Sequence, residues 1–183
     1  MSLNQNPELK RAVLDLNQKE KDKLLVRLIG KDKMLMKQLH YQLLENEADL
    51  EVRVGELNKQ LNTIIEIANK TITNRPTYTN HKELSYVLRY ASGIINEHEK
   101  VTKDKIGEFE ARLWLIKIVF QLFPKLFVRD GSLASDKLRI YITGRIKSLN
   151  LKYSKLHEDI QFDYQEDLSF ILQFAEERRL LPS

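Results

Sequence analysis

The residues of this chain best suited to binding chemistry are a set of basic side chains with one tyrosine among them. Positions 124–155 carry eight basic and two acidic residues, whereas positions 156–183 carry two basic and seven acidic ones. If positions 136–160 form one helix, a period of 3.6 residues places five of these side chains on a face about 80° wide. They are Lys137, Tyr141, Arg145, Lys152 and Lys155. A basic stripe with an interleaved aromatic can contact phosphates, stack on a base or bind an acidic protein surface.

The acidic end of the chain offers a structural alternative for the same charges. A last helix that folds back could bring Glu176 or Glu177 near Arg145 or Lys147 and cancel much of the field inside the molecule. The open alternatives for the stripe are therefore internal pairing or a solvated face, an acidic protein partner, and nucleic acid.

A loop at positions 73–79 adds two further candidates for partner binding. Arg75 and Tyr78 are residue types enriched at interface hot spots, and Pro76 lies between them. A simple connection between helices is the alternative interpretation of this loop.

Recognisable catalytic signatures do not occur in the sequence. The chain has no cysteine, which excludes thiol nucleophiles and cysteine-ligated metals. None of its four histidines lies in a zinc-protease or di-iron spacing, and its glycines form no phosphate-binding loop. We therefore predict no catalytic, cofactor-binding or metal site. A deep pocket in which Glu and His converge, for example His98 facing Glu108, would favour an enzyme instead.

Composition indicates an ordinary globular chain. Its 183 residues are 42% hydrophobic and 31% charged, and the net charge of +4 is too small to indicate nucleic-acid binding unless the charge is clustered. The first residues lack the apolar core of a signal peptide, so a cytoplasmic location is expected. We expect no membrane association.

The segment around Trp114 must hold the core together. Positions 113–123 are apolar in nearly every direction around a helix, and only Glu110, Lys117 and Gln121 mark a polar edge. The run is too short to span a bilayer and already carries a lysine. The sequence therefore predicts a buried central helix near 106–127, with Trp114 enclosed by neighbouring helices and Pro124 ending it.

Capping residues and apolar spacing place the other helices. Asn6-Pro7, Asn17 with Glu20, and Asp32 predict three short N-terminal helices, the third with Met36, Leu39 and Leu43 on its inner face. We predict three further helices, which begin at Asn80, at Ser132 or Ser135, and after Asp163. Positions 139–143 are rich in β-formers, but the helical arc from Leu138 to Ile160 outweighs a strand there.

Between positions 47 and 73 the apolar residues step by threes and fours, as in a coiled coil. This narrow seam is either a core edge or a homodimer surface, formed by Leu50, Val54, Leu57, Leu61 and Ile64.

The sequence thus predicts an all-α chain of about seven or eight helices, arranged as antiparallel hairpins in a bundle or a short α-α superhelix. We expect a single domain over 1–183, with a possible subdivision into 1–73 and 80–183. The predicted function is non-enzymatic: a macromolecular interaction or scaffold protein that binds protein partners through a helical groove or the basic face. Nucleic-acid binding through the basic face of 137–155 is the alternative, and a small-molecule enzyme without a recognisable motif is the third.

Overall fold

The computed structural model describes residues 3–181, and in that range every regular element is a helix. This confirms the predicted all-α class and helix number, and the strand alternative at 139–143 is wrong. The eight α-helices and two 3₁₀ turns of the described chain are η1 (Leu3–Gln5), α1 (Pro7–Leu14), α2 (Gln18–Ile29), α3 (Lys33–Leu44), α4 (Glu47–Thr71), α5 (Tyr78–Thr102), α6 (Lys105–Leu122), η2 (Pro124–Phe127), α7 (Leu133–Tyr153) and α8 (Glu158–Glu177).

Contacts within the chain group it into two compact units, Met1–Asn46 and Glu47–Ser183. The boundary falls at the break between α3 and α4. The expectation of a single domain, with a possible subdivision at 73 and 80, stays a prediction.

In the first unit the predicted caps begin the helices. The side chain of Asn6 accepts a hydrogen bond from the first turn of α1, and Pro7 is the first residue of that helix. Asn17 and Glu20 form a reciprocal capping box at the start of α2, and Asp32 caps α3. These bonds satisfy amide groups that a helix leaves free at its start.

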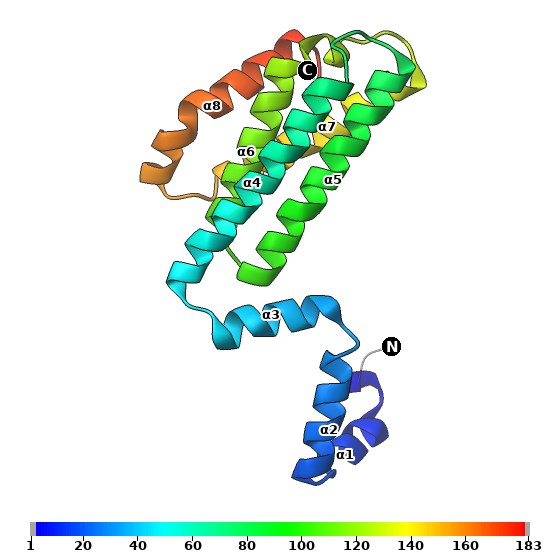
Figure 1. Cartoon of the computed structure of the whole chain (residues 1–183), viewed down its shortest axis with the longest axis vertical. Coiled ribbons are helices and arrows are strands. Elements are labelled where there is room, and N and C mark those ends of the chain that lie inside the picture. The colour runs from blue at the N-terminus through cyan, green and yellow to red at the C-terminus, as the bar shows by residue number, and fades with distance from the viewer. Residues whose placement is uncertain (1–2, 182–183) are drawn as a thin grey trace. The chain divides into compact units, whose positions relative to one another are not determined.

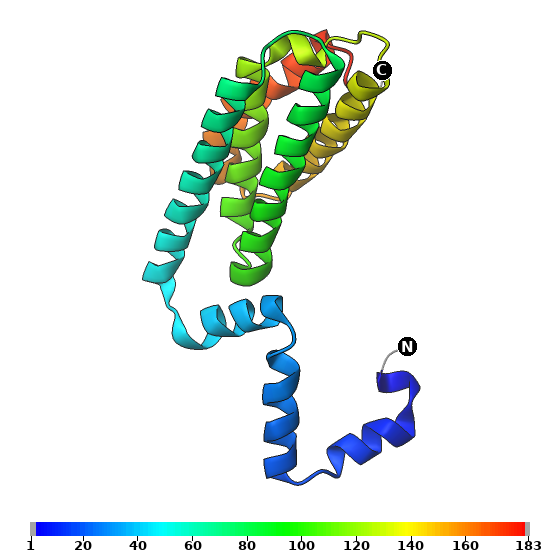
Figure 2. The same ribbon diagram turned by 45° about the vertical axis from the view of Figure 1, so that its right-hand side comes forward.

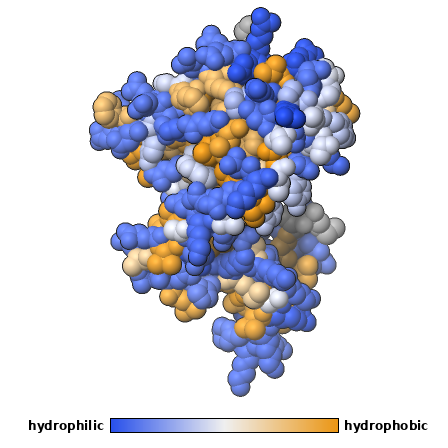
Figure 3. All heavy atoms as spheres, turned by 45° about the horizontal axis from the view of Figure 1, so that its top comes forward, coloured by the Kyte–Doolittle hydropathy of each residue, from blue (hydrophilic) through white to orange (hydrophobic). Residues whose placement is uncertain are grey.

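The same three helices contain no fully buried side chain among the described residues. The expected inner face of α3 is therefore wrong for two of its three residues: Leu39 is half-buried, but Met36 is exposed and Leu43 is 70% exposed. Exposed hydrophobic side chains also interrupt the hydrophilic surface on the face drawn in Figure 3. Side-chain caps begin all three helices, and no buried core covers them among the described residues.

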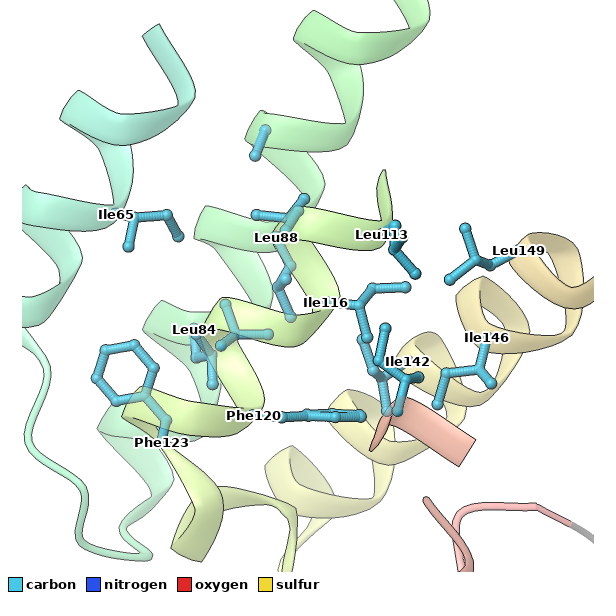
Figure 4. Packing of buried hydrophobic residues seen from close by; sticks show 14 of the residues in the cluster. Ile65, Leu84, Leu88, Leu113, Ile116, Phe120, Phe123, Ile142, Ile146 and Leu149 are labelled. Atoms are coloured by element: carbon cyan, nitrogen blue, oxygen red, sulfur yellow. The ribbon is translucent and has the colours of Figure 1, made fainter. Parts of the chain in front are cut away.

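In the second unit, α4, α5 and α6 run side by side as antiparallel hairpins (Figures 1 and 2). α6 contacts α4, α5, α7, α8 and η2, so it is the central helix that the sequence predicted. Figure 4 shows side chains from α4, α5, α6 and α7 converging on one apolar cluster, with Phe120 of α6 among them. No helix in the described part of the chain is both long and apolar enough to cross a bilayer.

Trp114 departs from the expected position because it is only half-buried. It lies four residues after Glu110 and three before Lys117, so helical spacing places it on the polar edge of α6. That edge is joined to α8 by the hydroxyl of Tyr164, which donates to Glu110, and by an ion pair between Lys117 and Asp167. The phenylalanines of α6, rather than its tryptophan, fill the centre.

The predicted continuous helix over 136–160 is also wrong. α7 starts after Ser132 as expected but ends at Tyr153, and a turn over 154–157 leads into α8. The Tyr153 hydroxyl donates to the carbonyl of Gln161 (2.9 Å), and the Gln161 amide donates to the carbonyl of Leu156 (2.8 Å). These bonds hold the reversal that brings Leu168 and Ile171 of α8 into the core.

The seam of α4 is used by this chain itself. Leu57 and Leu61 are buried in the core with α5 and α6, while Leu50, Val54 and Ile64 are half-buried. Leu57 and Leu61 are therefore not available to a second copy. Homodimerisation itself stays a prediction.

Replacing Phe120 or Leu115 of α6 with aspartate should abolish cooperative unfolding. Phe120 is buried, so Phe120→Asp removes about 3–5 kcal/mol of packing and adds a buried carboxylate, against a total stability of about 5–15 kcal/mol for a domain. Thermal melting followed by circular dichroism measures this. The control is Gln121→Asp, at the exposed neighbouring position, which should melt as wild type does. A cooperative wild-type melt for Phe120→Asp would show that α6 is not the core helix.

Candidate functional site

A groove between the start of α5 and the start of α7 gathers basic and aromatic side chains. We call it the basic groove, and it has a volume of about 260 Å³. None of the lining residues that the structure describes is acidic. They are Tyr78, Lys82, Ser85, Tyr86 and Arg89 from α5, and Leu133, Ala134 and Lys137 from α7.

Helical spacing explains why α5 contributes so many of these residues. Steps of three and four residues place Tyr78, Lys82, Tyr86 and Arg89 on one face of the helix. The opposite face carries Leu84 and other apolar side chains that pack on α4 and α6. Tyr78 and Tyr86 are 61% and 71% exposed, so their rings are open to a ligand.

Tyr141 of α7 connects the groove to the interior. Its hydroxyl lies 2.9 Å from that of Ser92 and donates to the carbonyl of Leu88 at 3.3 Å, which ties α7 to α5. The guanidinium carbons of Arg89 and Arg145 lie 5.4 and 5.1 Å from the centre of the Tyr141 ring. Both distances suit cation–π contacts. Each arginine is thereby positioned without a carboxylate partner among the described residues.

Lys152 differs from these arginines because it is paired with a buried carboxylate. Glu108 is 5% exposed, and its two oxygens accept hydrogen bonds from Lys152 Nζ (2.6 Å) and Arg112 Nε (2.9 Å). Arg112 also donates to the side-chain oxygen of Asn96 (2.6 Å). A buried carboxylate requires such partners. Burial alone would raise the pKa of Glu108, but the hydrogen bonds from Lys152 and Arg112 outweigh it and hold this pKa below its usual value.

The seven residues predicted to bind partners do not form one site. Tyr78 and Lys137 line the basic groove, and Tyr141 and Arg145 line a small crevice next to it. Lys152 is neutralised by Glu108, Lys155 lies beyond the end of α7, and Arg75 lies in the loop before α5. The predicted stripe is thus divided between the groove, the core and a turn.

Internal neutralisation by the C-terminal helix does not involve the predicted pairs. Among the described residues, neither Glu176 nor Glu177 forms an ion pair with Arg145 or Lys147, and Glu177 accepts a hydrogen bond from Gln173. Arg139 of α7 instead donates to the carbonyls of Arg178 and Arg179 at the end of α8. Such bonds satisfy carbonyls that a helix leaves free at its end.

Sequence reasoning missed Lys82, Tyr86 and Arg89. A usable signal was present, because basic and aromatic residues recur every three or four positions along the exposed face of α5. Their proximity to Lys137 could not be read from spacing, since roughly 50 residues of sequence separate them from it.

The histidines do not form a metal site within the described residues, where no group of three or more potential ligands occurs. His98 lies 3.4 Å from Asp104 rather than facing Glu108, and His40 lies 2.7 Å from Glu45. His81 is fully buried, with Nδ1 3.6 Å from the carboxylate of Asp130.

Comparison of the chain with protein-family models, with curated proteins and with solved structures finds no match.

The Glu108 cluster predicts a defined acid sensitivity. Because the pKa of Glu108 is lowered in the folded state, its contribution is fully present above the usual value of 4.5 and is lost as the pH falls through the folded value. Glu108→Gln should destabilise the protein at pH 7 by about 3 kcal/mol, the typical cost of breaking a buried pair. Chemical unfolding from pH 7 to pH 3 should show this difference shrinking at low pH.

Glu66→Gln, at an exposed position of α4, is the matched control and should leave stability nearly unchanged at every pH. An equal loss for Glu108→Gln at pH 3 and pH 7 would show that the cluster does not carry the pH dependence.

Proposed function

We propose that this protein is a binding module that takes an acidic segment of a partner protein in the basic groove. The observation that supports it most directly is the lining: Lys82, Arg89 and Lys137 lie around exposed tyrosine rings, with no acidic lining residue among those described.

The charges of the groove are available for a ligand in a way that those of the core are not. Arg112 and Lys152 are already paired with Glu108, whereas the one described contact of Arg89 is with the ring of Tyr141. A partner carboxylate would gain charge-assisted hydrogen bonds here without first breaking an ion pair. Surface cations of this kind chiefly steer association and set specificity.

The aromatic and apolar lining favours a protein ligand. Tyrosine supplies large contact area at low entropic cost, and Leu133 adds an exposed aliphatic side chain at the end of the groove. A groove between two helices suits a partner helix with acidic residues beside apolar anchors. This combination supports an acidic, partly apolar peptide.

Nucleic acid is the alternative, and the exposed rings of Tyr78 and Tyr86 favour it, because bases stack on aromatic side chains. The neutralisation of Lys152 by Glu108 argues against it, since the predicted track of phosphate contacts is interrupted. We therefore place protein binding first.

Reversing two groove charges should weaken binding of an acidic peptide. The probe is a fluorescein-labelled helical peptide with glutamates beside leucines, followed by fluorescence anisotropy. Lys82→Glu with Lys137→Glu should raise its Kd at least about tenfold, which corresponds to about 1.4 kcal/mol. Wild-type binding should also weaken as salt rises from about 50 to 300 mM, because exposed charges are screened.

Lys59→Glu with Lys70→Glu is the matched control, because it makes the same charge change on the exposed face of α4. Equal loss in both double variants would indicate a general charge effect and contradict the proposed site. Tighter binding of a labelled oligo-dT single strand than of the peptide would assign the groove to nucleic acid instead.

A further inference from the structure

The outer face of α8 is acidic, whereas the described lining of the basic groove contains no acidic residue. Over its whole length, Glu158–Glu177, this helix contains no basic residue. Its acidic side chains are Glu158, Asp159, Asp163, Glu166, Asp167, Glu176 and Glu177. In the described structure Asp167 is paired with Lys117 of α6, and Asp159 lies 3.2 Å from His157.

An aromatic anchor lies among these acids. Phe162 is 78% exposed, the highest value of any large hydrophobic residue described, and Phe170 is 37% exposed. Helical spacing places Glu166 one turn after Phe162 on the same outer face, while Leu168 and Ile171 face the core. An exposed phenylalanine flanked by carboxylates is the kind of ligand that the tyrosines and cations of the basic groove would accept.

The two surfaces lie on different helices and face different neighbours. The basic groove is formed by α5 and α7, whereas α8 packs on α6 and α7, and Figure 1 shows α5 and α8 on opposite sides of this unit. One molecule therefore presents an acidic aromatic face and a basic groove in separate places.

We propose that the occupant of the basic groove is the outer face of α8 from a second copy of this chain, with Phe162 as the anchor and Asp163 and Glu166 beside Lys82 and Lys137. This rests on the proposed function, since it names the acidic segment that the groove binds. Opposite charges on the two faces provide the complementarity that selects this pairing.

Such a contact is heterologous, because the two surfaces that meet are different. A pair joined by one such contact keeps an unused α8 face on one copy and an unused groove on the other, so association continues into a ring or an open chain. Particle mass should rise with protein concentration and fall with added salt.

Two charge-reversal variants and their mixture test this pairing. Lys82→Glu with Lys137→Glu disables the groove, and Asp163→Lys with Glu166→Lys disables the α8 face. Sedimentation velocity at about 50 mM salt should show concentration-dependent assemblies for wild type and monomers for each variant alone. An equimolar mixture should associate again, because one variant supplies the intact groove and the other the intact α8 face, and the two reversed faces also carry opposite charges.

The matched control for α8 is Glu51→Lys with Glu66→Lys on the exposed face of α4, which should assemble as wild type does. Thermal melting confirms that each variant is folded. A monomeric wild type under these conditions, or a mixture that stays monomeric, would overturn the self-pairing. If the labelled acidic peptide still binds the groove in that case, the proposed function stands and only the identity of the partner is wrong.

Discussion

The burial of α6 is the constraint on which the rest of the second unit depends. Over positions 113–122 this helix is apolar on every side except the edge that carries Lys117 and Gln121, so it is stable only when other helices cover it. α4, α5, α7 and α8 supply that cover by turning their apolar faces inward. The outward faces of α5 and α7 then meet at the surface, and the basic groove is the consequence of how these two helices pack on α6.

A second constraint is the carboxylate of Glu108 inside this core. An uncompensated charge at such a position would cost several kcal/mol, so Arg112 and Lys152 are held as its partners. The cations of α7 therefore have different roles along the helix. Near the end of the helix, Lys152 neutralises Glu108. Near its start, Lys137 remains at the surface in the basic groove, and between the two Arg145 lies over the ring of Tyr141.

Acidic side chains are concentrated on α8, apart from the basic groove of α5 and α7. The acidic residues of α8 and the cations of α5 and α7 belong to different helices, and no ion pair joins them in the described structure; Asp167 pairs with Lys117 of α6 instead. The first unit differs, because its short helices bury no side chain among those described, although each begins at a side-chain cap. Helices of this length gain little stability from hydrogen bonding alone.

The sequence by itself determined most of the helical elements, because their signals are local, although Thr77 rather than Asn80 caps α5 and α8 begins at Glu158 rather than after Asp163. Asn17 with Glu20 caps α2, Pro124 ends α6, and the apolar run of α6 identified the core helix. Only the tertiary structure decided where α7 ends, since no glycine or proline marks the reversal after Tyr153 and long-range contacts of α8 stabilise it. The tertiary structure also decided which basic side chains are paired with a carboxylate and which are not. Lys137 and Lys152 share one face of α7 by spacing, but the carboxylate that neutralises Lys152 comes from α6, 44 residues away, and spacing within one helix carries no information about another.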